Sequence, residues 1–258
     1  QYNYAVKDLF QLRVDIFPLP EKLMTRHSDY VHQAAQEMPQ QVNVASYSLE
    51  PRPGLKGVKP FPKDLRATHG FDNQANELSL SPLLLDAFLR LSVSIVESPD
   101  FNEENVGIWA DFFQPPPAEA NTQDEVERRL RRFLSLAFRG PVEEPTLDRY
   151  ISYALEKMEQ GLSFSDSMKK VTSAALSSPR FLYRATTLDS ADDQYELASN
   201  LSFFLWSSGP DDELLQLAQQ GELSKPELLQ RTIDRMLADP KIERFLDTFP
   251  AQWMQLEN

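Results

Sequence analysis

The sequence predicts an all-α protein, an array of packed amphipathic helices with a long irregular proline-rich segment in its N-terminal part. Apolar residues recur at three- and four-residue spacing in one segment after another, which is the helical period. Most of these segments open on a capping residue followed by proline or an acid. With 258 residues, of which 41% are hydrophobic and 25% charged, the chain can bury a substantial core.

The N-terminal part alternates helices with proline breaks. An amphipathic helix is expected over residues 2–10, and after Pro18 and Pro20 a polar helix over 21–38. Residues 39–80 are expected to be irregular, with one short candidate strand near 42–47. Ser81-Pro82 predicts the start of a helix of about fifteen residues. Ser98-Pro99 repeats this pattern of a cap followed by proline.

A proline-rich stretch divides the predicted helices into two groups. Gln114-Pro-Pro-Pro-Ala-Glu-Ala120 is typical of a stiff, solvated linker. We therefore expect an N-terminal helical domain over 1–113, a linker over 114–121 and a C-terminal helical domain over 122–258, the last of them incomplete.

The predicted C-terminal domain is a succession of helices. Thr122-Gln-Asp-Glu125 predicts a capping box. Further helix starts are predicted at Pro145, Ser163, Ser178-Pro179, Asp192, Ser224 as a cap before Pro226, and Asp239-Pro240. Around Leu201–Leu215 an apolar helix ends and another begins, with Ser208 or Gly209 as the expected cap and Pro210 as the expected first helical residue.

Charge and composition exclude several classes of function. The net charge of -13 makes a nonspecific grip on nucleic acid or an anionic membrane unfavourable and favours a neutral or basic partner. Without cysteine, the chain can form no disulfide, thiolate nucleophile or Cys-x-x-Cys-His haem attachment. No apolar run reaches transmembrane length. The serine-hydrolase elbow, the dinucleotide fingerprint and the phosphate loop are also missing from the sequence.

Two groups of residues are candidates for chemistry. His69, Asp72 and Asn73 share a glycine-containing turn, where they would either ligate a cation or orient an imidazole, or simply hydrogen-bond local backbone. Asp211 and Asp212 would serve either as catalytic acids or as groups that satisfy the backbone donors and offset the dipole at a helix start.

Two further patterns have both a structural and a functional interpretation. The basic run Arg128-Arg-Leu-Arg-Arg132 fits the solvated side of an amphipathic helix, with phosphate or carboxylate binding as the alternative. Six aromatic residues at helical spacing fit a core, with a cofactor pocket as the alternative: Phe203, Phe204, Trp206, Phe245, Phe249 and Trp253.

Five motifs in a fixed order carry a resemblance to a known family. They are Tyr2-Asn-Tyr-Ala-Val-Lys-Asp-Leu9, His69-Gly-Phe-Asp-Asn73 with Leu80-Ser-Pro-Leu-Leu-Leu85, Arg131-Arg-Phe-Leu134 with Ala137-Phe-Arg-Gly-Pro141, Ser178-Pro-Arg-Phe-Leu-Tyr-Arg184, and Leu201–Leu215. In these motifs the chain resembles the planctomycete-type cytochrome-linked multidomain family, a series of domains of unknown function.

The resemblance implies an exported bacterial protein of the periplasm or cell envelope, truncated here at both ends. It also implies a c-type haem on an upstream or partner module, since this chain binds no haem covalently. It carries no established catalytic residues.

The leading hypothesis is a helical portion of an exported cytochrome-c-associated redox protein, which docks a haem module, a protein partner or an extracellular polymer substrate. If the whole protein is an enzyme, an oxidoreductase is favoured. One alternative is a carbohydrate-active or other hydrolytic enzyme using His69, Asp72 and the acids near Asp211. The other is a purely structural scaffold.

Overall fold

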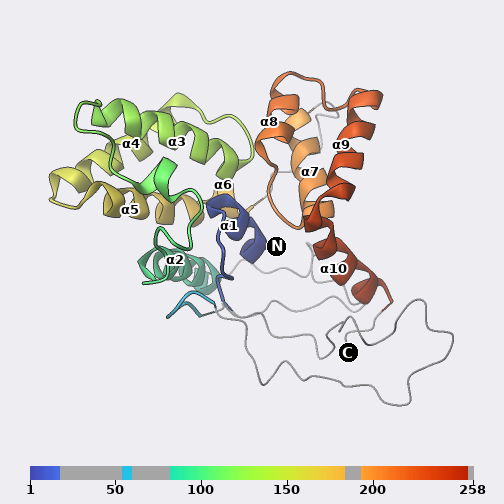
Figure 1. Ribbon diagram of the computed structural model, residues 1–258, viewed down its shortest axis with the longest axis horizontal. Helices are drawn as coiled ribbons and strands as arrows, with labels where there is room; N and C mark the ends of the chain where they lie inside the picture. Colours follow the sequence, from blue (N-terminus) through green and yellow to red (C-terminus); the bar gives the residue numbers. More distant parts are fainter. Residues whose placement is uncertain (18–53, 60–81, 184–192, 255–258) are drawn as a thin grey trace, which may run out of the picture.

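The computed structural model describes residues 1–17, 54–59, 82–183 and 193–254, and these residues form an all-α protein (Figure 1). Within them the extended pairing amounts to two isolated bridges, Leu12 with Val106 and Asp15 with Gly54. The predicted fold class is confirmed. The helix expected over 21–38, the candidate strand over 42–47 and all of the segment 39–80 except residues 54–59 lie outside the described residues.

The larger group of helices runs from α1 to α6 (Figure 1). Its members are α1 (Tyr2–Phe10), α2 (Pro82–Glu97), the π-helical turn η2 (Trp109–Phe113), α3 (Thr122–Phe138), α4 (Glu144–Glu159), α5 (Phe164–Leu176) and the short α6 (Pro179–Leu182). Helix α5 packs against both α2 and α4. The core is rich in aromatic rings: the buried Phe10 lies 5.1 Å from Phe101 and 5.6 Å from Phe133, between ring centres.

The smaller group comprises α7 (Gln194–Trp206), α8 (Asp212–Gln219), α9 (Pro226–Ala238), the 3-10 turn η3 (Pro240–Ile242) and α10 (Glu243–Trp253). Its core is centred on Trp206, which is completely buried with Leu214, Leu223 and Met236. Figure 1 shows this group, in orange and red, beside α1.

The larger core draws on both sides of the predicted linker. Phe113, which directly precedes residues 114–121, and Leu130, which follows them, are both completely buried in the same hydrophobic cluster. The division into two domains at this linker stays a prediction, whereas the packing joins the helices on its two sides.

Several helix starts agree with the predictions. Helix α2 begins at Pro82. Ser163 caps α5 by accepting a hydrogen bond from the Asp166 amide, and Ser178 caps α6 by accepting one from the Arg180 amide. Asp239 caps η3, which leads directly into α10.

Other predicted starts are wrong. The cap of α3 is Asn121 rather than Thr122, because the extended Asn121 presents its side-chain oxygen to the amides of Gln123 and Asp124. The residue before α9 is Lys225, which provides no side-chain cap, and Ser224 instead binds Gln194.

No helix begins at Ser98-Pro99, where the chain makes turns instead. The Ser98 hydroxyl donates to the Lys56 carbonyl and accepts from the Asp100 amide, so this serine fixes a turn against residues 54–59. A serine before a proline is compatible with a turn as well as with a helix start, because its hydroxyl can bind local backbone groups in both.

Candidate functional site

The acids at the start of α8 have structural partners. Asp211 is the cap, and it replaces the predicted Ser208 or Gly209, with Pro210 lying before the helix. Its Oδ1 accepts from the Leu214 amide at 2.9 Å, and its Oδ2 accepts from the Arg235 guanidinium at 2.7 Å.

Asp212 pairs with Arg132 of α3 at 2.8 Å, so the two carboxylates are held by cations on different helices. The interpretation of these acids as groups that satisfy a helix start is therefore confirmed for Asp211. Their use as a catalytic pair gains no support from this geometry.

The predicted site residues His69, Asp72 and Asn73 lie outside the described residues. Within the part of the chain that the structure describes, no group of three or more His, Asp or Glu side chains could hold a metal ion. Within those residues, too, none of the helices has the length and apolar character to cross a membrane.

The basic run on α3 is neutralised by carboxylates. Arg128 and Arg129 both bind Glu125, and Arg131 binds Glu127 and Glu144. The prediction of a solvated face is wrong for Arg129, whose side chain is only 7% exposed.

Arg129 also donates to the carbonyls of Phe112 and Gln114 and lies 5.0 Å from the centre of the Phe164 ring. Its role is to fix the start of the proline-rich stretch onto α3, which leaves little capacity for a phosphate ligand.

Arg139 is a second structural arginine that the sequence did not reveal. It ends α3 in the left-handed conformation with φ 62° and is buried. Its guanidinium donates to the carbonyls of Arg180, Phe181 and Tyr183 at 2.7, 3.0 and 2.6 Å. Gly140-Pro141 signals the end of the helix, but the left-handed conformation ordinarily favours glycine, so the sequence held no local signal for the burial of Arg139.

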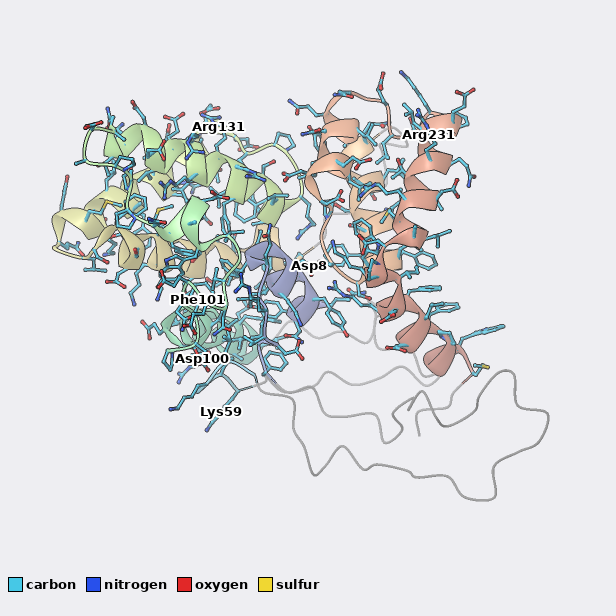
Figure 2. The ribbon with its side chains drawn as sticks, in the orientation of Figure 1. Asp8, Lys59, Asp100, Phe101, Arg131 and Arg231 are labelled. Atoms are coloured by element: carbon cyan, nitrogen blue, oxygen red, sulfur yellow. The ribbon has the colours of Figure 1, made fainter. Side chains whose placement is uncertain are left out.

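A junction of charges surrounds Trp206. The indole N–H donates to the Met236 carbonyl at 3.1 Å, and the Lys241 ammonium lies 4.4 Å from the ring centre. Arg244 donates to the Trp206 carbonyl and, with both of its terminal nitrogens, to Asp8. Figure 2 shows Asp8 on the side of α1 that faces α10. This junction joins the two groups of helices.

The feature with the strongest functional character is a row of aromatic side chains on α7 and α10. We define the aromatic row as Phe204, Phe245, Phe249 and Trp253. Ring centres are 5.0 Å apart for Phe204 and Phe245, 5.0 Å for Phe245 and Phe249, and 6.2 Å for Phe249 and Trp253. The three α10 rings are almost parallel, at 11° and 16°.

The aromatic row is open to solvent over much of its length. Phe204 is 58% exposed, Phe249 37% and Trp253 67%, and the neighbouring Leu246 and Met254 are 48% and 54% exposed. The prediction of an aromatic core is thus right for Trp206 and Phe203 but wrong for Phe204, Phe249 and Trp253. Large apolar groups gathered on one surface are typical of an interaction site.

Family models match three successive parts of the chain, each described as a protein of unknown function. PSD3 (DUF1587) matches residues 54–98, PSD5 (DUF1595) matches 125–185 and PSD4 (DUF1592) matches 193–258. The chain contains three consecutive domains of unknown function. The series of domains predicted from the motifs is confirmed. No curated protein and no solved structure matches the chain.

The three matches place the structural features in their domains. The PSD5 match covers all of α3 but its first turn, together with α4 to α6, and so includes both structural arginines. The PSD4 match covers α7 to α10 and includes the entire aromatic row. The most exposed apolar surface therefore belongs to the PSD4 region, whose core is the smaller of the two.

Proposed function

We propose that this chain is the helical docking portion of an exported bacterial redox protein associated with a c-type cytochrome. The aromatic row of the PSD4 region docks a haem-bearing module. The observation that carries the proposal is the solvent exposure of Phe204 and Trp253, at 58% and 67%, in a contiguous series of rings. The haem, the export to the periplasm or envelope and the electron transfer come from the family resemblance of the motifs.

The stacking of the rings favours a protein partner over a polysaccharide. A sugar ring binds on the face of an aromatic side chain, but the faces of Phe245 and Phe249 cover each other at 5.0 Å and 11°. The stack presents mainly ring edges, together with one outer indole. Ring edges are suited to insertion among the apolar side chains of a partner.

The charge of the chain favours a basic partner. Residues 193–254 contain eleven acidic and five basic side chains. Of the basic ones, Arg235 and Arg244 are bound to carboxylates and Lys241 lies over Trp206. A partner with lysines around an apolar centre would therefore be attracted over a long range and then held by the aromatic row.

The alternative hydrolytic function has no comparable support. Asp211 is used as a helix cap and as the partner of Arg235, and Asp212 is paired with Arg132. The other residues of this hypothesis, His69 and Asp72, lie outside the described residues.

The proposal makes a spectroscopic prediction for the complete protein. Material purified from its source should show the Soret and α bands of a covalently bound c-type haem, or should co-purify with a subunit that does. A complete gene product and its complexes without any c-type haem would overturn the cytochrome assignment.

Docking is tested by titrating this chain with the separately prepared haem module. Trp253→Ala and Phe204→Ala should each weaken binding about tenfold or more, because exposed aromatic anchors dominate interface energies. Leu237→Ala is the matched control, since Leu237 is 49% exposed on α9 outside the aromatic row. Equal dissociation constants for all three variants would contradict the proposed surface.

A further inference from the structure

Helix α1 lies between the two groups of helices and presents a different face to each. Val6 and Phe10, four residues apart, are completely buried in the core of the larger group. Tyr4 and Asp8, also four residues apart, lie on the other side of the helix, and Figure 2 shows Asp8 facing α10. Helix α1 precedes all three family matches, so none of them accounts for it.

The second face of α1 holds the PSD4 region through polar contacts. Arg244 of α10 binds both carboxylate oxygens of Asp8 at 2.8 Å and lies 4.4 Å from the centre of the Tyr4 ring. The Lys241 ammonium lies 3.9 Å from Asp8, and the Ser208 hydroxyl donates to the Tyr4 carbonyl. The PSD4 region thus contacts α1 through the turn after α7, through η3 and through the start of α10.

The two groups of helices keep separate hydrophobic cores. The two buried clusters have no residue in common, and among the described helices those that pack extensively on one another belong to the same group. Further contacts between the groups are also made by charged side chains. Arg132 pairs with Asp212 at 2.8 Å, and the Arg139 guanidinium lies 5.8 Å from the centre of the Phe203 ring. Folded units that share a polar interface and no common core ordinarily move relative to one another.

We propose that the polar face of α1 is a latch for the PSD4 region. In the closed form, which the structure shows, Asp8 holds Arg244 and thereby fixes α10 together with its aromatic row. Without the Asp8 carboxylate, α7 to α10 move away from α1 as a unit that keeps its own core around Trp206. The latch sets the position of the aromatic row relative to the larger group, and it is independent of what the row binds.

The latch is tested on the 258-residue chain by measuring the distance between spin labels on the two groups. The chain has no cysteine of its own, so Asp148→Cys on α4 and Arg231→Cys on α9 place both labels at exposed positions. The intact latch should give one narrow distance distribution. Asp8→Asn combined with Asp212→Asn should raise the population of longer distances at least about tenfold, because it removes one shielded and one exposed ion pair. An unchanged distribution would overturn the proposal.

Salt distinguishes the two ion pairs. In Asp8→Asn alone, the Arg132–Asp212 pair remains, with side chains 67% and 52% exposed, so sodium chloride should increase the population of longer distances. The chain with an intact latch should respond less, because the Arg244 and Asp8 side chains are only 16% and 21% exposed. An equal response of the two proteins to salt would contradict the role of Asp8.

Hydrogen exchange measured by mass spectrometry separates opening from unfolding. In the Asp8→Asn/Asp212→Asn variant the amides of α8 and α9 should stay as protected as in the unmutated chain, because their core is intact. Longer distances accompanied by loss of this protection would show that the PSD4 region unfolds rather than opens, and would overturn the latch.

Asp86→Asn is the matched control, because the ion pair of Asp86 with Arg90 lies within α2 and joins no two groups. It should leave the distance distribution unchanged. A shift equal to that of the double variant would indicate a general effect of lost charge and would overturn the assignment to α1.

Discussion

Arg244 binds Asp8 through two hydrogen bonds of 2.8 Å, one to each carboxylate oxygen, and thereby ties the last described helix to the first. The two side chains are 16% and 21% exposed, so the pair is largely shielded from solvent. Arg244 also lies 4.4 Å from the centre of the Tyr4 ring, and the Ser208 hydroxyl donates to the Tyr4 carbonyl. The start of the chain is therefore part of the support of the PSD4 region.

Asp8→Asn should lower the free energy of unfolding by about 1–3 kcal/mol, because the largely buried guanidinium of Arg244 loses the carboxylate that it binds. Urea denaturation followed by circular dichroism measures this loss. A double-mutant cycle with Arg244→Met isolates the pair.

Asp86→Asn is the control for this pair. Asp86 and Arg90 form an ion pair on α2 with side chains 47% and 80% exposed, and such pairs contribute little. A loss of the same size in Asp86→Asn and Asp8→Asn would show that the Asp8 contact has no special role.

The ion pairs of Glu125 should make the stability of the fold sensitive to acid. Its hydrogen bonds to Arg128 and Arg129 lower the pKa of its carboxyl from 4.5 to about 2. Because the folded-state pKa is the lower one, the stabilisation is complete above about pH 4.5 and is lost as the pH falls towards about 2. Glu125→Gln should therefore flatten the decline in stability over this range, measured by urea denaturation at several pH values.

The control for the acid effect is Arg128→Met. This variant keeps the carboxyl but removes its main partner, so the pKa of Glu125 should rise and the stability should begin to fall at a higher pH. Carbon-detected NMR titration of Glu125 reports the pKa directly. A carboxyl that titrates at 4.5 in the unmutated protein would contradict the ion pair.

Arg139→Met should lower the free energy of unfolding by about 2–4 kcal/mol, because it deprives three carbonyls of α6 and its C-terminal end of their donor. Arg139→Lys should restore only part of this loss, since an ammonium cannot reproduce the guanidinium fork.

Gln11→Gly is the control for the backbone conformation of Arg139. Both residues end a helix in the left-handed conformation, but Gln11 carries no guanidinium. Gln11 ends α1 with φ 51° and is exposed, so glycine should be tolerated or should stabilise by up to about 1 kcal/mol. If Arg139→Gly proved equally harmless, the carbonyl contacts would have no energetic weight.

Truncation of the two tryptophans should lower the stability by very different amounts. Trp206→Ala should cost about 3–5 kcal/mol, because the ring is completely buried and bonded to the Met236 carbonyl. Trp253→Ala should cost less than about 1 kcal/mol, because two thirds of that side chain is already exposed. Thermal unfolding of both variants measures the difference, and a strongly destabilised Trp253→Ala would assign this ring to the fold rather than to docking.

The sequence predicts the helices well because their signals are local. Apolar spacing and caps such as Ser163 depend only on neighbouring residues, and the structure agrees with them. Asn121 and Thr122 are adjacent and either could cap α3. The backbone angles decide which of them is the cap, and the sequence does not state those angles.

The surface was harder to predict than the fold. Helical spacing places Phe204 and Trp253 on apolar faces but does not state whether another helix covers those faces. Arg129 is the reverse case. Its position in a basic run suggests exposure, but it is buried because it binds the carbonyls of Phe112 and Gln114, which precede it by 17 and 15 residues. The residues that cover or expose a side chain come from other parts of the chain, so the aromatic row becomes visible only in the folded protein.

Hydroxyl-radical footprinting of Trp253 and Met254 tests most directly whether the aromatic row is a docking surface. These side chains should be oxidised readily in this chain alone, where they are 67% and 54% exposed. In the complete protein bound to the proposed haem-bearing module they should be protected several-fold, while Leu237 on α9 is labelled equally in both. Equal oxidation of Trp253 and Met254 in the two samples would contradict docking by the aromatic row.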